Sequence, residues 1–103
     1  ARIVLLFFAE MILEIISPEA KLFSGEITSI TVPGVDGSFQ ILNNHAPIVS
    51  LLQKGTISIT APSLKFSKEA ASLFTKVNDQ NYTLAISSGT IEMKDNKVIV
   101  LAD

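Results

Sequence analysis

Apolar and polar residues alternate along most of the chain from Met11 onward, in short runs separated by clusters of Gly, Pro, Asn and Asp. Residues 56–60 show this most clearly, because Ile57 and Ile59 fall on one face and three hydroxyl side chains fall on the other. Strict alternation is typical of a sheet with one buried and one wet face. The pattern predicts an all-β fold: a two-sheet antiparallel β-sandwich or flattened barrel of about 8–10 short strands.

Eight segments have the length and composition of strands. They are residues 12–16, 26–32, 38–42, 48–52, 56–60, 82–87, 90–94 and 97–102. The stretch 32–38 contains two glycines and predicts a tight connection with Val35 and Asp36 at its tip. It is not a phosphate-binding loop, because it lacks the Lys-Ser/Thr pair and lies between strands instead of opening a helix.

The segment 61–81 does not follow this pattern of short strands separated by turns. Four apolar residues within it follow an i, i+3, i+4, i+7 spacing, which predicts a short helix over 67–77 with Ser67 as its N-cap. They are Ala70, Leu73, Phe74 and Val77. The alternative is a longer β-hairpin, since Phe, Thr and Val all suit strands.

The first ten residues differ from the rest of the chain in their pattern. Their apolar run, from Ile3 to Ala9, is far shorter than the ~20 residues that a membrane-spanning helix needs. Phe8-Ala9-Glu10 is a poor match to a signal-peptide cleavage site. We therefore interpret 1–10 as upstream or added sequence, or as an additional strand. Residues 11–103 are expected to form a single β-sandwich domain with an insertion-like segment at 61–81.

The composition argues against several classes of function. With 103 residues, 48% of them hydrophobic and 17% charged, the chain can form one packed domain and is not disordered. Its net charge of -2 and its lack of a basic block argue against nucleic acid as a partner. The absence of cysteine excludes a disulfide scaffold and a thiol nucleophile. So few charges indicate that a partner covers part of the surface.

Little in the sequence suggests catalysis. His45, the only histidine, lies in a polar turn with no nucleophile or base beside it, so a structural hydrogen bond is the expected role. No calcium-loop spacing follows Asp36. We expect no catalytic residue, cofactor, metal or small-molecule substrate. A free-standing β-sandwich that binds a peptide or a carbohydrate remains the alternative, although it would need an aromatic-lined groove.

Three motifs, in this order along the chain, add a family resemblance. They are LEIISPEAKLFSGE at 13–26, PGVDGSFQILNNHAP at 33–47 and SSGTIEMKDNKVIVLAD at 87–103. Together they resemble the N-terminal β-sandwich of the epsilon subunit of bacterial and chloroplast-type rotary ATP synthases, with a match over 13–60 and 82–103.

The resemblance implies a non-catalytic rotor subunit in the central stalk. Such a subunit links the gamma subunit to the polar loops of the membrane c-ring and helps couple proton flow to ATP synthesis. It is peripheral, without membrane insertion, at the cytoplasmic face of the bacterial inner membrane. The implied c-ring-facing residues are Val35, Asp36, Gly37 and Ser38. The implied gamma-facing residues are Ser17, His45 and Ser50.

The sequence departs from the family pattern in three places. Ser38 occupies a position that is acidic in some members, and Asn43 and Asn44 stand where the family more often has Pro followed by Gly or Asn. The two-helix C-terminal hairpin of the family does not follow Asp103. We therefore expect this polypeptide neither to bind ATP nor to inhibit ATP hydrolysis by inserting a hairpin.

Overall fold

The computed structural model describes residues 11–43, 45–61 and 73–103. These residues form ten strands and no helix. The strands are β1 (Met11–Ile16), β2 (Lys21–Ile27), β3 (Ser29–Gly34), β4 (Gly37–Leu42), β5 (Ile48–Leu52), β6 (Gly55–Thr60), β7 (Phe74–Asn78), β8 (Asn81–Ile86), β9 (Gly89–Lys94) and β10 (Lys97–Ala102). The predicted all-β class is confirmed.

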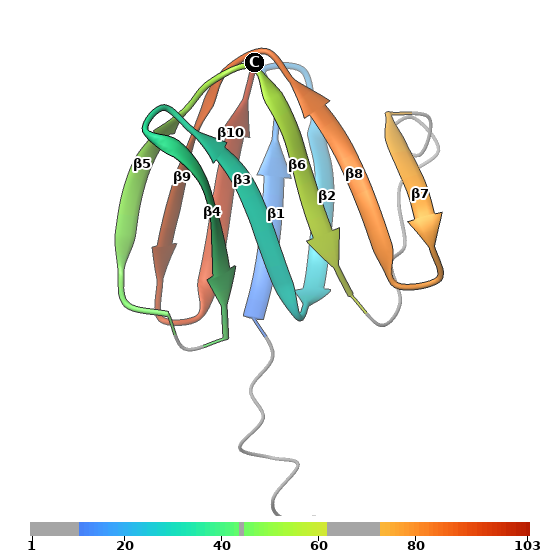
Figure 1. Cartoon of the computed structure of the whole chain (residues 1–103), viewed down its shortest axis with the longest axis horizontal. Helices are drawn as coiled ribbons and strands as arrows, with labels where there is room; N and C mark the ends of the chain where they lie inside the picture. The colour runs from blue at the N-terminus through green and yellow to red at the C-terminus, as the bar shows by residue number, and fades with distance from the viewer. Residues whose placement is uncertain (1–10, 44, 62–72) are drawn as a thin grey trace, which may run out of the picture.

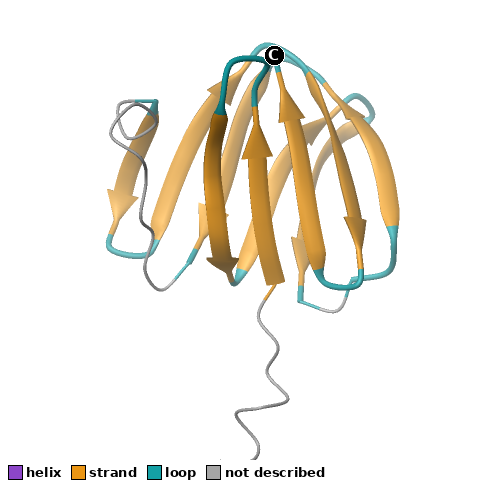
Figure 2. Ribbon diagram, turned by 180° about the vertical axis from the view of Figure 1, so that it is seen from behind, coloured by secondary structure: helices purple, strands orange, loops and turns teal. Residues whose placement is uncertain are grey.

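The strands form two layers that share one hydrogen-bonded path. β2-β1-β10-β9-β5 make the first layer, and β4-β3-β6-β8-β7 make the second (Figures 1 and 2). The layers join where Gly34 of β3 pairs with Leu52 of β5. This is the predicted sandwich with one difference: β1 and β10, from opposite ends of the sequence, pair in parallel, whereas the other pairs are antiparallel.

The core lies between the layers and follows the alternation of the sequence. Leu13 and Ile15 of β1 are fully buried and pair with Val98 and Val100 of β10. Ile57 on β6 is equally buried in the opposite layer. Burying one such aliphatic side chain contributes about 1.5–3 kcal/mol, so this alternation supplies the main driving force for the sandwich.

The predicted strand 26–32 is wrong as a single element. β2 ends at Ile27 and β3 begins at Ser29, and the N–H of Thr28 between them donates to the carbonyl oxygen of Thr60 at 2.7 Å. β2 extends back to Lys21, because Phe23 and Ile27 alternate into the core. The chain therefore reverses direction at Thr28, inside what appeared to be a continuous strand.

The predicted helix is wrong over its described residues, and residues 67–72 lie outside the described part of the chain. Phe74–Asn78 form β7, where Phe74 is buried and faces Leu84 of β8. Leu73 and Val77 are exposed, so the helical stripe has no core to pack against. The hairpin alternative is confirmed for β7 and β8, whose turn is held by Asn78 Oδ1 accepting from Asn81 Nδ2 at 2.8 Å.

The predicted turn at 32–38 is confirmed. β3 and β4 are joined by Val35 and Asp36 alone, and Gly34 pairs with Gly37. Gly37 has a φ of 122°, a backbone conformation that residues with a Cβ rarely adopt. Glycine is therefore required there by the backbone, and the turn presents Val35 and Asp36 at the surface.

Candidate partner-binding surface

The sandwich has two ends, and the residues proposed from the sequence are divided between them. Gly34, Leu52, Gly89 and Ala102 lie in register across four strands and mark the end where the chain terminates (Figure 1). We call this the C-terminal end. It also carries the Val35–Asp36 turn and the β1–β2 turn, because Ile16 pairs with Leu101.

The proposed c-ring-facing residues therefore stay together. Val35 and Asp36 form the β3–β4 turn, and Gly37 and Ser38 begin β4. All four are exposed. This part of the prediction describes one continuous loop at the C-terminal end.

The proposed gamma-facing residues do not cluster. Ser17 lies at the C-terminal end, in a turn where its Oγ accepts from the N–H of Ala20 at 3.2 Å. Ser50 is half-buried within β5, and its Oγ donates to the carbonyl oxygen of Leu51 at 3.3 Å. His45 lies at the opposite end. A partner that contacts both Ser17 and His45 must reach both ends of the sandwich.

His45 has the local structural bond that the sequence suggested. Its Nδ1 is placed to donate to the carbonyl oxygen of Ala46 at 2.6 Å, and its backbone N–H donates to the carbonyl oxygen of Leu42 at 3.1 Å. The ring is exposed. Nearby, the side chain of Asn96 donates to Asn43, which ties the β4–β5 connection to the β9–β10 turn.

The outer faces of the two layers differ in chemistry. On the second layer, one residue from each strand forms an uncharged polar row across the sheet. The row is Gln40, Thr31, Ser58, Thr83 and Thr75. A row of hydroxyl and amide groups remains hydrated at little cost, so this face is suited to solvent.

The outer face of the first layer combines aliphatic side chains with polar ones, since Glu92 of β9 pairs with both Val49 and Ile99. Val49 and Leu51 of β5 are 75% and 61% exposed, and Leu101 of β10 is 51% exposed. Ile16 and Ile99 are half-buried on the same face. Several exposed aliphatic side chains on one face of a small domain often mark an interaction site. The outer face of the first layer is therefore the better candidate for contact with a partner.

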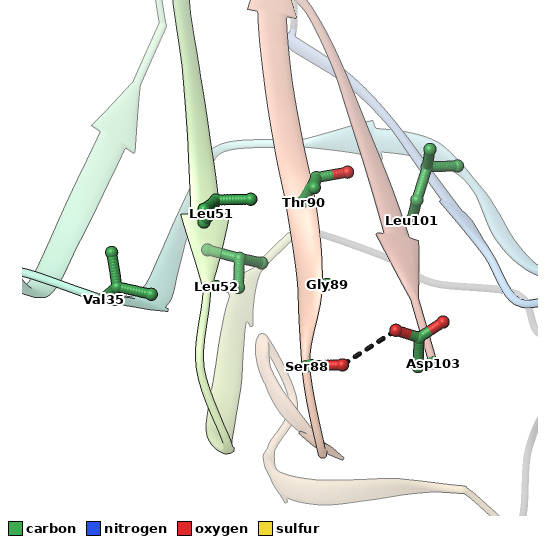
Figure 3. Close-up of a pocket in the computed structure, with 8 residues that line it drawn as sticks. All are labelled: Val35, Leu51, Leu52, Ser88, Gly89, Thr90, Leu101 and Asp103. Carbon is green, nitrogen blue, oxygen red and sulfur yellow. Dashed lines mark hydrogen bonds between the residues drawn. The ribbon is translucent and has the colours of Figure 1, made fainter.

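A shallow groove of about 460 Å³ lies where this face meets the C-terminal end (Figure 3). Eight residues line it: Val35, Leu51, Leu52, Ser88, Gly89, Thr90, Leu101 and Asp103. The Ser88 hydroxyl donates to the Asp103 carboxylate at 2.8 Å. The lining is aliphatic and small, with no aromatic residue, which does not match the groove expected for a carbohydrate-binding protein.

Sequence reasoning missed Leu51 and Leu101 as surface residues. The available signal was a break in alternation: Leu51 and Leu52 are adjacent apolar residues on one strand, so one of them must face outward. Leu101, between Val100 and Ala102, is a second such break. Neither break indicates by itself that the two strands lie in the same layer.

An ion-pair cluster centred on Glu14 lies on the same outer face of the first layer. The Glu14 carboxylate lies 2.9 Å from Lys97 Nζ and 3.0 Å from Lys21 Nζ, so it joins β1 to both neighbouring strands. Hydrogen bonds from Lys97 and then from Lys21 hold the pKa of the Glu14 carboxyl below its ordinary value of 4.5. The cluster neutralises a carboxylate whose side chain is only 16% exposed.

Among the described residues, no group of three His, Cys, Asp or Glu side chains is arranged to hold a metal ion. The described part of the chain also has no helix long and apolar enough to cross a membrane.

The chain is similar to ATP synthase subunits. A family model described as the ATP synthase, Delta/Epsilon chain, beta-sandwich domain matches residues 10–72. The ATP synthase epsilon chain of Neisseria meningitidis serogroup C is 37% identical over 93 residues, which are 90% of this chain and 56% of the relative. The chain thus spans little more than half the length of that relative.

A shorter relative is covered almost completely. The ATP synthase epsilon chain of Chlorobium limicola is 35% identical over 91 residues, 88% of this chain and 86% of the relative. A chain in the solved structure of the Euglena gracilis mitochondrial ATP synthase, OSCP/F1/c-ring, has the same fold, with a TM-score of 0.70 at 19% identity over 91% of this chain and 51% of that one. The chain therefore belongs to the family of ATP synthase delta and epsilon chain β-sandwich domains.

Proposed function

We propose that this chain is a non-catalytic central-stalk domain of a proton-translocating ATP synthase, which links the gamma subunit to the c-ring at the cytoplasmic face of a bacterial membrane. Family membership supports the proposal. The observation that carries it is the group of exposed aliphatic side chains on the outer face of the first layer, Val49, Leu51 and Leu101. Exposed aliphatic side chains are suited to permanent attachment, since obligate interfaces are the more apolar ones.

The two sets of proposed contact residues fit a link between two partners. Val35, Asp36, Gly37 and Ser38 form an exposed loop that can meet the polar loops of a c-ring. Ser17, His45 and Ser50 are proposed to meet gamma. Because Ser17 and His45 lie at opposite ends, gamma would have to span the sandwich from one end to the other.

Binding to the purified gamma subunit tests this function. The full chain should co-purify with gamma at a 1:1 ratio, and His45→Ala should weaken the complex. Thr56→Ala, on the exposed polar face of the second layer, is the matched control and should bind like wild type. A folded wild-type chain that shows no binding to gamma would contradict the proposal.

A further inference from the structure

The groove at the C-terminal end continues the outer face of the first layer instead of forming a separate feature. Leu51 and Leu101 belong to both, and each is more than half exposed. Figure 3 shows Leu51 on β5, Thr90 on β9 and Leu101 on β10, three neighbouring strands of the first layer. A partner that covers this outer face therefore reaches the groove without a gap.

The groove also includes Val35, from the turn assigned above to the c-ring. The N–H of Val35 donates to the carbonyl oxygen of Leu51 at 3.2 Å, and the N–H of Gln53 donates to the carbonyl oxygen of Pro33 at 2.9 Å. These two bonds fix the turn against the end of β5. The 48% exposed side chain of Val35 thus lines the same groove as Leu51.

The groove is suited to an apolar side chain of the partner. Its walls are Val35, Leu51, Leu52 and Leu101. Two hydroxyl groups also line it, those of Ser88 and Thr90, and the Ser88 hydroxyl already donates to Asp103. An apolar anchor inserted into such a depression loses little hydrogen bonding and removes several half-exposed side chains from water.

The surroundings of the groove are acidic. Asp103 lines one side, and Asp36 follows Val35 in the turn on the other. This end carries three carboxylates, Asp36, Glu19 and Asp103, against the ammonium groups of Lys54 and Lys21, and Lys21 is already paired with Glu14. A basic side chain beside the apolar anchor would complement this charge and accelerate association.

We infer that the groove receives an apolar side chain of the gamma subunit flanked by a Lys or Arg, and that Val35 therefore contacts gamma and not the c-ring. This inference rests on the proposed function. Asp36 then flanks the gamma contact, and Gly37 and Ser38 remain the ring-facing part of the loop. The gamma contact then extends along β5 and ends in the groove at the C-terminal end.

Affinity for purified gamma, measured by surface plasmon resonance on the full chain, tests the apolar part. Leu51→Ser and Val35→Ser should each weaken binding by roughly ten-fold or more, as expected for central apolar contacts. The control is Val77→Ser on β7: Val77 and Leu51 are both 61% exposed, but Val77 belongs to the second layer. Val77→Ser should bind like wild type, and circular dichroism of each variant verifies folding.

The charge part is tested with a second pair of variants. Asp36→Asn should slow association with gamma at low salt, and added salt should reduce the difference from wild type. Asp79→Asn is the control, because Asp79 is fully exposed on the β7–β8 turn, away from the groove. Equal association rates for the two variants and wild type would contradict the inference that a Lys or Arg of gamma flanks the apolar anchor.

The possible failures are distinguishable. If folded wild type does not bind gamma, the proposed function itself fails, and the inference fails with it. If wild type binds but Leu51→Ser and Val35→Ser bind equally well, the inference is overturned while the proposed function stands.

Discussion

The carboxylate of Glu14 lies 2.9 Å from the ammonium group of Lys97, across the parallel pair formed by β1 and β10. Lys21 of β2 approaches the other carboxylate oxygen at 3.0 Å. Three adjacent strands, including the first and last described strands of the chain, are thereby joined on the outer face of the first layer. Glu14 is the ionisable group on which the pH dependence of this sheet should depend.

Glu14→Gln should reduce the sensitivity of the fold to acid. Hydrogen bonds from Lys97 and Lys21 lower the pKa of Glu14 in the folded chain, so its contribution to the free energy of unfolding is complete above the ordinary value of 4.5. That contribution decreases as pH falls below 4.5 through the lower folded pKa. Urea unfolding at about pH 6 and about pH 3 should show a smaller loss for Glu14→Gln than for wild type.

Glu26→Gln is the control for that experiment. Glu26 is exposed on β2 and faces Ile12, the outward residue two positions before Glu14 on β1. Removing its charge should leave the loss of stability on acidification unchanged. An equal effect of the two substitutions would show that total charge, and not the bonds to the two lysines, sets the acid sensitivity.

Ile91→Ala should destabilise the sandwich strongly, whereas Leu51→Ala should not. Ile91 of β9 is fully buried, and Leu51 on the adjacent strand is 61% exposed. Truncating a buried Ile costs about 2–5 kcal/mol through lost burial and the cavity left behind. Surface substitutions usually change the free energy of unfolding by about 0.5 kcal/mol or less. Urea denaturation of both variants measures the difference, and equal values would contradict the assigned core.

Alternation predicted the strands that contribute regularly to the core. Ile57 and Ile59 on β6 are buried, as their spacing required. Alternation did not predict the chain reversal at Thr28. Ile27 and Ser29, on either side of the reversal, are both buried, so the two-residue spacing of buried positions continues across the boundary between β2 and β3. The helical spacing of apolar residues around Phe74 also gave a wrong prediction, because Phe74 packs against residues of other strands, Leu84 and Phe23.

The candidate surface was less predictable than the core. The β3–β4 turn could be predicted because Gly37 and its neighbours determine local geometry. The groove could not, since it requires Val35, Leu51 and Leu101 from three separate parts of the sequence to meet at one end of the sandwich. The position of His45 relative to Ser17 likewise depends on strand register, which no local motif encodes.

Gly89→Ala should disturb the pairing of β9 with β10. A Cβ at this position would lie 2.4 Å from the carbonyl oxygen of Leu101, which is backbone and cannot move aside alone. Overpacking of this kind typically costs about 1–3 kcal/mol. Thr90→Ala, at the next position of the same strand, is the control and should cost less. Thermal unfolding compares the two, and equal melting temperatures would argue against the close approach.

The Phe23–Phe74 contact should couple the two layers at the edge formed by β2 and β7. The ring centroids lie 6.4 Å apart at an interplanar angle of 60°, an edge-to-face geometry, and the two rings come from different layers. Aromatic pairs of this geometry contribute about 0.5–1.5 kcal/mol beyond the area that they bury. A double-mutant cycle with Phe23→Leu and Phe74→Leu should therefore give an interaction energy in that range.

The cycle also tests whether β7 is attached to the sandwich by more than its hairpin with β8. The ladder between β7 and β8 is interrupted between Lys76 and Asn78, which leaves the aromatic contact as a substantial link to the opposite layer. If the two substitutions are additive, the rings do not stabilise each other. In that case β7 would be held through β8 and the buried area of Phe74 alone, and hydrogen exchange of β7 should respond to changes in β8 but not to Phe23→Leu.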